Sequence, residues 1–360
     1  MEFINQMAPW IGEEEKQALI AYLDGGGWLT EFRKTQEFEE MIATYTGSRY
    51  AVAVANGTVS LTAALLSLGI GHDNEVIVPD FTMLASATAI ILAGARPVFV
   101  DVNPSDWCMD LDQVEKLITP NTRALMVVSI NGRSPDMQRA LEICQTHDLA
   151  LVEDAAQALG SRHKGKHLGT WGAIGSFSFS APKVITTGQG GALVTDDAAL
   201  MEKIRKIKDF GRRKAGEDYY ETVGFNFKFT DIQAVVGIEQ MKKLAWRVER
   251  KKEILRLYMK NLATVPEVHF PQTDLADVSP WFIDIMVPDP SALTERLKEK
   301  GVGTRAVYPA LHSQPAFNMA GHFPGAEYVA KHGLWLPSSS FLRDEDVDFI
   351  CHSIKTFYNA

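Results

Sequence analysis

The sequence has few cysteines, no long apolar run and no excess of basic residues. Its 360 residues include three cysteines, and none of them lies at CxxC spacing from another: Cys108, Cys144 and Cys351. This scarcity argues against a disulfide framework, a zinc site or an iron–sulfur cluster, so we expect no metal and a reducing, cytoplasmic location. No stretch is long enough to span a bilayer, and the N-terminus lacks the features of a signal peptide.

The charge balance excludes another class of protein. Lysine and arginine total 36 against 45 aspartates and glutamates, a net charge of −9. General nucleic-acid binding requires a basic surface, so we expect no nucleic-acid partner, although a local basic patch for a small anion remains compatible. With 46% hydrophobic and 22% charged residues the composition is that of a globular protein.

From residue 51 onward, apolar runs alternate with helical patterns. Strands are predicted at 51–55, 75–79, 97–101, 123–130 and 149–154, and helices at 57–70, 83–94 and around 135–147. Continuous apolar strands separated by helices are typical of a mostly parallel sheet covered on both faces, which is an α/β fold. Ligands of such folds bind beyond the carboxyl ends of the strands.

The pattern changes near Thr230. Residues 230–262 predict one long helix, with Thr230 or Asp231 as its N-cap. Further strands at 281–287 and 304–309, and helices at 290–301 and 344–358, predict a smaller α+β domain. We therefore divide the chain into a large domain, residues 1–246, and a small domain, residues 247–360.

A single lysine, Lys183, lies between the β-patterned "SFSF" and the glycine-rich "TTGQGG". An amine that forms a Schiff base must be desolvated enough to lose its proton near neutral pH. The preceding strand offers an apolar wall, and the glycines allow the backbone to approach a bound group closely. The alternative is a lysine that extends from a strand end into solvent.

Three other elements accompany this lysine. Asn56-Gly57-Thr58 opens a helix after a strand, which suits a phosphate but also an ordinary helix cap. Glu153-Asp154 ends a buried strand, where an acid either meets a ligand or caps the next turn. "GFNFKFTDIQA" (224–234) places Asn226 and Lys228 among aromatic residues. A lysine for an aldehyde, an acid for a ring nitrogen and N–H groups for a phosphate match the needs of pyridoxal phosphate.

These motifs, in this order, resemble those of the sugar aminotransferases of the DegT/DnrJ/EryC1/StrS family. The similarity runs from about Trp28 to the C-terminus and is strongest in "NGTVSL", "EVIVPDFT", "EDAAQALG", "FSFSAPKVITTGQGGALVT" and "GFNFKFTDIQAVVGIEQ". The resemblance implies a pyridoxal-phosphate-dependent transferase of fold type I, an α/β fold with a large, mostly parallel domain and a smaller α+β domain.

The same resemblance implies which residues contact the cofactor ring. Lys183 would form the Schiff base and shuttle the proton, and Asp154 would pair with the pyridine nitrogen. Gln157 would reach the ring hydroxyl, and Ala156 would pack under the ring. Met83 takes a position at which relatives usually carry an aromatic residue, and its polarizable sulfur is able to cover a ring face.

The cofactor phosphate and the subunit arrangement follow from the resemblance too. Gly57, Thr58 and Ser178 would hold the phosphate, joined by Asn226 from a neighbouring subunit. A complete site would then require a homodimer with shared active sites.

Within the family, the pattern is most similar to the GDP-perosamine synthases. This similarity implies amino transfer from L-glutamate to C4 of GDP-4-keto-6-deoxymannose, for surface polysaccharide (O-antigen) or glycan biosynthesis. Arg212 and Arg213, in the basic segment 203–216, could meet the diphosphate, although such a charge run is often a solvated helix face. Trp28, Tyr308 and His312 fall where relatives contact the sugar, although a lone histidine such as His312 is more often an ordinary surface histidine.

Other functions fit less well. The alternatives within the family are a dTDP- or UDP-linked 3- or 4-keto sugar as substrate, and a sugar dehydratase, whose relatives carry histidine in place of the lysine. "GSRHKGKH" (160–167) resembles the loop of a nucleotide triphosphatase, but His167 stands where Ser or Thr must hold magnesium. That segment predicts a hairpin with Gly165 and Lys166 at its turn.

Overall fold

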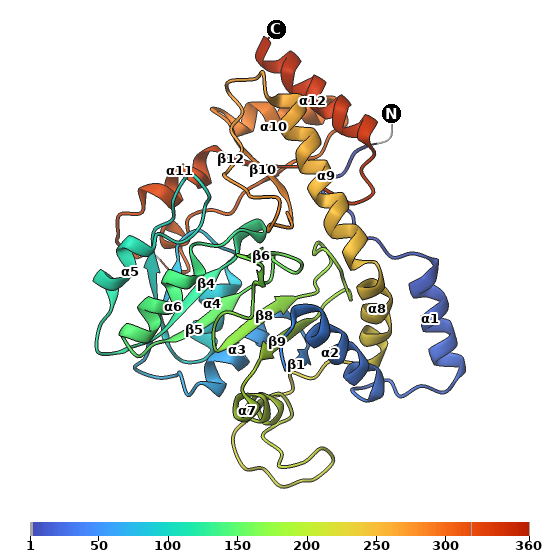
Figure 1. Ribbon diagram of the computed structural model, residues 1–360, viewed down its shortest axis with the longest axis vertical. Helices are drawn as coiled ribbons and strands as arrows, with labels where there is room; N and C mark the ends of the chain where they lie inside the picture. The colour runs from blue at the N-terminus through green and yellow to red at the C-terminus, as the bar shows by residue number, and fades with distance from the viewer. Residues whose placement is uncertain (1–2, 318, 360) are drawn as a thin grey trace.

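A seven-stranded sheet lies at the centre of the larger part of the molecule (Figure 1). The computed structural model describes residues 3–317 and 319–359. The strands are β1 (Tyr50–Val54), β2 (Glu75–Pro79), β3 (Arg96–Val100), β4 (Thr122–Val128), β5 (Ala150–Asp154), β8 (Ile174–Ser178) and β9 (Gly191–Thr195). Their order is β1-β9-β8-β5-β4-β2-β3, and only the pairings of β9 are antiparallel. The predicted mostly parallel α/β sheet is confirmed.

Helices cover both faces of this sheet because successive strand residues point to opposite sides. Val52 and Val54 pack toward α3, α4 and α7, whereas Ala51 and Ala53 pack toward α2, α5, α6 and α8. The helices of this part are α1 (Glu13–Asp24), α2 (Arg33–Thr46), α3 (Gly57–Ser67), α4 (Ala85–Leu92), α5 (Leu111–Leu117), α6 (Met137–Thr146), α7 (Ala198–Lys208) and α8 (Asp231–Lys242). Both sides of the sheet are thus apolar, as its uninterrupted hydrophobic strands require.

The long helix predicted over 230–262 is broken. Thr230 is its N-cap, because its hydroxyl accepts a hydrogen bond from Gln233 N, but α8 ends at Lys242 and α9 (Leu244–Leu262) follows after Lys243. At the break the Lys243 ammonium pairs with Glu15 at 2.8 Å, which ties the start of α1 to this point. The break therefore coincides with a contact from a distant part of the chain.

The C-terminal part contains a three-stranded antiparallel sheet, which is compatible with the predicted α+β arrangement. Its elements are β10 (Ile283–Met286), α10 (Pro290–Glu299), β11 (Arg305–Ala306), α11 (Pro324–His332), β12 (Gly333–Leu336) and α12 (Asp344–Asn359). The strand expected at 304–309 is much shorter, since the chain leaves the sheet toward Asp80, whose carbonyl accepts from Leu311 N at 3.0 Å. A separate apolar core begins at Ile254 within α9. Because α9 runs unbroken through residue 246, the division into 1–246 and 247–360 stays a prediction.

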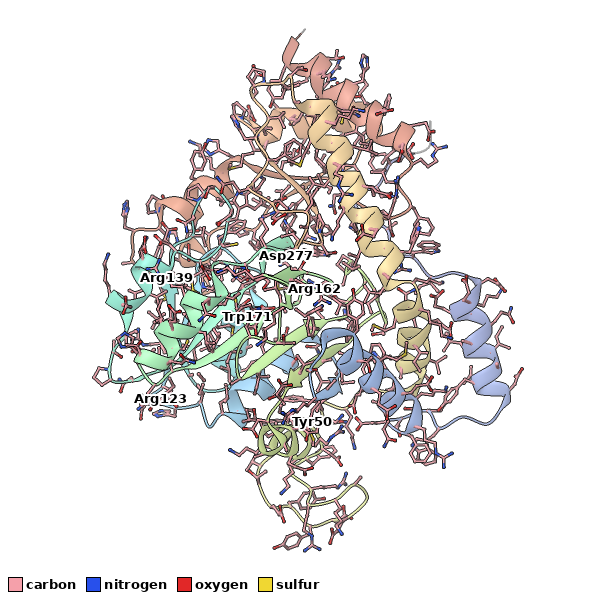
Figure 2. All side chains as sticks on the ribbon, in the orientation of Figure 1. Tyr50, Arg123, Arg139, Arg162, Trp171 and Asp277 are labelled. Atoms are coloured by element: carbon pink, nitrogen blue, oxygen red, sulfur yellow. The ribbon has the colours of Figure 1, made fainter. Side chains whose placement is uncertain are left out.

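Residues 160–167 form the predicted hairpin, of β6 (Arg162–His163) and β7 (Lys166–His167). Its turn is Lys164-Gly165, both with positive φ, and not Gly165-Lys166 as predicted. Arg162 and Asp277, labelled in Figure 2, lie together where Arg162 N donates to Asp277 O at 2.8 Å. A hairpin in this place lacks the loop-to-helix geometry of a phosphate-binding P-loop.

Two features are absent from the described residues. No group of three or more His, Cys, Asp or Glu side chains in this part of the chain is placed to hold a metal ion. None of its helices combines the length and the apolar character that a membrane span requires.

Candidate active site

A cavity of about 680 Å³ lies at the carboxyl ends of β1, β5 and β8. Its volume is within the range of small-molecule and cofactor sites. Eight of the nine predicted cofactor residues line it: Gly57, Thr58, Met83, Asp154, Ala156, Gln157, Ser178 and Lys183. The fold therefore brings together residues that are up to 126 positions apart, from Gly57 to Lys183 (183 − 57), at one edge of the sheet.

Asp154 is the last residue of β5 and is almost completely buried. One carboxylate oxygen accepts a hydrogen bond from Ala156 N at 3.1 Å, and the other accepts from Ser86 Oγ at 2.7 Å. Burial raises the pKa of Asp154, although these two hydrogen bonds and the charge of Lys183 act in the opposite direction. The carboxylate is thus fixed in orientation and aimed at a cavity that also holds a lysine.

The Lys183 side chain is half-buried at the same cavity. Burial lowers the pKa of Lys183 to about 8; the nearby Asp154 raises it, and Arg305 lowers it further. Its Nζ lies 3.9 Å from the centroid of the Trp281 ring. An amine with this pKa is uncharged in about a tenth of molecules at pH 7, far more often than an ordinary lysine, and the uncharged form is the nucleophile toward an aldehyde.

The start of α3 provides an anion site. Asn56 caps the helix by accepting from Val59 N at 3.0 Å through Oδ1 and from Ser60 N at 3.1 Å through its carbonyl. In the described chain no hydrogen bond satisfies the N–H groups of Gly57 and Thr58, which line the cavity. A Cβ on Gly57 would lie 3.0 Å from the Ser178 Cβ, so glycine allows the hydroxyl of Ser178 to approach the helix start. Two free N–H groups beside hydroxyls suit a phosphate.

Gln157 and Met83 complete the cavity wall. The Oε1 atom of Gln157 accepts from Asn131 N at 2.8 Å, which fixes the amide and leaves its NH₂ group available to a ligand. Met83 is 45% exposed at the mouth. A reactive amine, a buried acid and a phosphate cradle within one cavity fit pyridoxal phosphate, whose aldehyde, ring nitrogen and phosphate need these three partners.

Three predicted residues on the segment from Asp209 to Lys228 do not line this cavity. Figure 1 shows this segment as part of the long loop that follows α7. Asn226 is exposed and forms a β-bridge with Asp209. Arg212 pairs with Asp209 at 3.1 Å, and Arg213 pairs with Glu217. None of these three residues therefore lines the cofactor cavity of its own chain.

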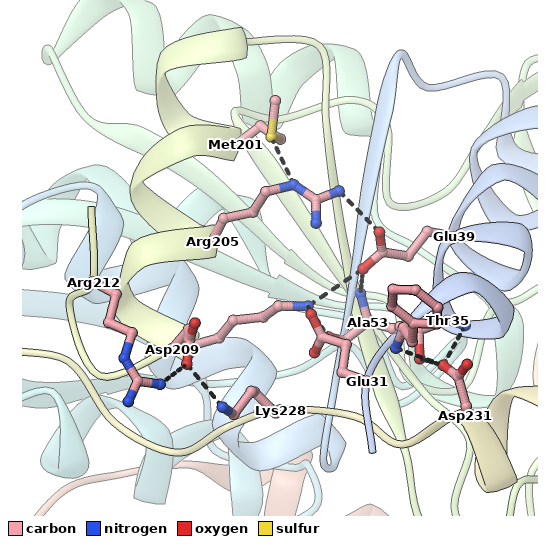
Figure 3. Close-up of polar contacts among 12 residues, drawn as sticks. Glu31, Thr35, Glu39, Ala53, Met201, Arg205, Asp209, Arg212, Lys228 and Asp231 are labelled. Carbon is pink, nitrogen blue, oxygen red and sulfur yellow. Dashed lines mark hydrogen bonds and ion pairs between the residues drawn. The ribbon is translucent and has the colours of Figure 1, made fainter. Parts of the chain in front are cut away.

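Trp28 also lies outside the cavity, on a segment that is firmly anchored (Figure 3). It is 63% exposed. The carboxylate of Asp231, at the start of α8, accepts from Phe32 N at 2.8 Å and Thr35 N at 2.9 Å. The buried Lys208 ammonium pairs with Glu31 at 3.0 Å. These contacts hold residues 28–35 against α7 and α8.

Tyr308 and His312 are packed into the protein and do not line the cavity. His312 is buried, so the alternative of a surface histidine is wrong: its Nδ1 lies 2.7 Å from Asp80 Oδ2, and its backbone N–H donates to Asp80 Oδ1. Tyr308 is half-buried, with its ring edge toward Trp335 at a centroid distance of 4.8 Å. Burial raises the Tyr308 pKa, and the field of Asp154 reaches it.

Three residues at the site were not singled out from the sequence: Ser86, Trp281 and Arg305. Arg305 is exposed, with its guanidinium 5.4 Å from the Trp335 ring, and among the described residues it pairs with no carboxylate. Its charge lowers the pKa of Lys183, which places it near the cavity. The sequence marks "TRAVYP" only as a strand, and nothing local in it indicates a neighbour more than 100 positions away.

Known proteins are similar to this chain over nearly its full length. The model of the DegT/DnrJ/EryC1/StrS aminotransferase family matches residues 9–355. A GDP-perosamine synthase of Escherichia coli O157:H7 is 35% identical, with 100% of both chains covered. The crystal structure of S. venezuelae DesV in complex with a ketimine intermediate has a TM-score of 0.92 at 31% identity, covering 98% of this chain and 99% of that one. DesI in the presence of its TDP-sugar product has a TM-score of 0.91 at 29% identity, covering 99% and 92%.

Proposed function

Because the chain belongs to the DegT/DnrJ/EryC1/StrS aminotransferase family, we propose that it transfers an amino group from L-glutamate to C4 of GDP-4-keto-6-deoxymannose. As a member it is a pyridoxal-phosphate-dependent nucleotide-sugar aminotransferase of fold type I. The observation that carries the proposal is the single cavity that holds Lys183, Asp154 and the start of α3. The choice of sugar is supported by the relative named GDP-perosamine synthase. The product would serve surface polysaccharide (O-antigen) biosynthesis.

The residues that line the cavity have different chemical roles toward the cofactor. Bound pyridoxal phosphate supplies an aldehyde for the amine and a ring that accepts electrons. Lys183 would supply the amine and carry the proton at Nζ, and Asp154 would hold the proton on the ring nitrogen. Gln157 would donate to the ring hydroxyl, and Ala156 and Met83 would contact the ring.

The phosphate end of the site would be completed by a second copy of the chain. Gly57, Thr58 and Ser178 would bind the phosphate from one subunit, and Asn226 of the second copy would bind it from the other. Support comes from large apolar side chains that are exposed beside the mouth or on the anchored segment: Met83, Leu84, Trp28, Leu29 and Phe32. Exposed apolar groups of this kind mark an interaction surface. We therefore propose a homodimer with shared active sites.

Arg305 is suited to a carboxylate of the amino donor. A guanidinium binds a carboxylate through two parallel hydrogen bonds. Arg305 is near Lys183 and pairs with no carboxylate of the described residues. The diphosphate of the sugar would meet Arg212 and Arg213 of the second copy, with Trp28, Tyr308 and His312 on the sugar side. The three unpaired cysteines support a reducing, cytoplasmic setting.

The proposal is tested by turnover of a small panel of nucleotide sugars. The purified enzyme is incubated with L-glutamate and GDP-, dTDP- or UDP-linked 4-keto-6-deoxyhexoses, and the amino sugar is followed by mass. We expect the GDP compound to be preferred. A preference for the dTDP compound would replace the GDP assignment by the second candidate, which the TDP-sugar product of DesI favours. Loss of water from the sugar without gain of an amino group would indicate a dehydratase.

A further inference from the structure

The indole of Trp281 lies against the amine of Lys183. The lysine Nζ is 3.9 Å from the ring centroid, and Trp281 is 2% exposed. The indole Nε1–H donates to Pro182 O at 2.7 Å, so the ring is fixed to the backbone of the residue that precedes the lysine. Trp281 lies just before β10, 98 positions after Lys183 (281 − 183).

Two buried cations of α9, Arg247 and Lys251, hold the backbone around Lys183 and Trp281 in place. Arg247 Nη1 donates to Val184 O at 2.9 Å, and Lys251 Nζ donates to Trp281 O at 2.6 Å. The carbonyl before Lys183 is therefore held by Trp281, and the carbonyl after it by Arg247. The backbone is therefore fixed on both sides of Lys183, so the side chain is the part of this residue that is able to change conformation.

The Lys183 amine itself has little else to hold it. In the part of the chain that the structure describes, its Nζ makes no hydrogen bond or ion pair. The charged groups whose fields reach it are Asp154 at the end of β5 and Arg305 on β11, of opposite sign. The face of an indole attracts a cation through the ring quadrupole, and more strongly where water is excluded.

We infer that Trp281 is a positioning residue that holds the Lys183 side chain whenever its amine is free, with the indole face stabilising the ammonium form. The inference rests on the proposed function, in that Lys183 must be the lysine that alternates between a bound and a free state. When free, the ammonium rests on Trp281 within reach of the cofactor cavity, and loss of one proton returns it to the nucleophilic form. Trp281 thereby balances burial, which disfavours the charged amine.

A matched pair of variants separates the ring face from the indole hydrogen bond. Trp281→Phe and Trp281→Leu both lose the bond to Pro182 O, but only phenylalanine keeps an aromatic face. In the full chain freed of cofactor, the rate at which trinitrobenzenesulfonate modifies Lys183 is measured against pH by peptide mass. We expect Trp281→Leu to lower the apparent pKa of Lys183, so that its modification at pH 7 is about three- to ten-fold faster, and Trp281→Phe to stay within about two-fold of wild type. Lys164, exposed in the hairpin turn, is the internal control.

Equal rates in wild type and Trp281→Leu, or equal shifts in both variants, would overturn the inference. Fluorinated tryptophans provide a test that leaves the shape of the core nearly unchanged. Each added fluorine weakens the cation–π attraction between the ring and the amine. The apparent pKa of Lys183 should fall with each added fluorine, and a pKa independent of fluorination would equally reject the role. These measurements use no sugar and no amino donor, so failure of the substrate assignment leaves them unaffected.

Discussion

Ser86 Oγ donates a 2.7 Å hydrogen bond to Asp154 Oδ2, and the hydroxyl of Thr82 lies 2.9 Å from Ser86 Oγ. Both serine and threonine are completely buried. The relay links the start of α4 to the acid at the end of β5. A buried carboxylate oxygen that loses its donor bears the full desolvation penalty, so Ser86 both orients Asp154 and favours its ionised form.

We predict that Ser86→Ala raises the pKa of Asp154 and lowers kcat about ten-fold, with KM for both substrates within two-fold. Ser86→Thr, which keeps the hydroxyl, is the matched control and should retain most of the activity. The pH dependence of the visible absorbance of the holoenzyme gives a second readout, because it responds to the charge state of the bound cofactor that Asp154 is proposed to set. If the alanine variant titrated and turned over like wild type, the relay would be only a packing feature.

The proposed shared site predicts complementation between two inactive variants. Lys183→Ala lacks the amine, and Asn226→Asp would place a negative charge beside the cofactor phosphate of the proposed second subunit. In a mixed dimer, one of the two cavities combines the intact Lys183 of one chain with the intact Asn226 of the other. We expect mixing under conditions of subunit exchange to restore up to about a quarter of wild-type activity, from random pairing. Sedimentation of each variant checks the dimer, and a fully active wild-type monomer would contradict the shared site.

The sequence was sufficient for the features that depend on local patterns. Apolar strands at regular intervals predict the sheet, and Gly57, Asp154 and Lys183 each stand at or just beyond a strand end, where the parallel topology brings them together. Contacts between segments that are distant in the chain could not be predicted from local sequence patterns. The helix break at Lys243 meets Glu15 of α1, and Trp281 reaches Lys183 from the C-terminal part. Strand β12, four residues long between a helix and a proline, has too short a pattern to be distinguished from a loop.

Arg305 predicts a selective effect on the amino donor. Arg305→Leu removes the cation proposed for the glutamate carboxylate, and a charge-assisted hydrogen bond contributes about 1.5–3 kcal/mol. We therefore expect KM for glutamate to rise by at least about ten-fold, with KM for the sugar within two-fold. Arg296→Leu removes an arginine of α10 that pairs with Glu299, and it should change neither constant. If only the KM for the sugar rose, Arg305 would bind the nucleotide sugar and not the amino donor.

The buried Lys251 predicts a pH dependence of stability. Its ammonium donates only to the carbonyls of Trp281 and Ser338, and among the described residues no carboxylate pairs with it. Burial, and then the charge of Arg247, lower its pKa to about 7 from the ordinary lysine value of 10.5. Between these two values the unfolded chain binds more protons at this lysine than the folded chain, so its contribution to the free energy of unfolding rises with pH.

The difference between wild type and Lys251→Met isolates this contribution, because the other titrating groups are common to both proteins. One pKa unit corresponds to 1.36 kcal/mol, so wild type should gain about 2 kcal/mol relative to the variant between pH 7 and pH 9. Urea unfolding at both pH values measures the difference, and Lys164→Met, at an exposed hairpin position, is the control and should run parallel to wild type. If the stability of Lys251→Met changed with pH as that of wild type does, the Lys251 amine would have an ordinary pKa in the folded protein. Its hydrogen bonds to the two carbonyls would then offset the effect of burial on the pKa.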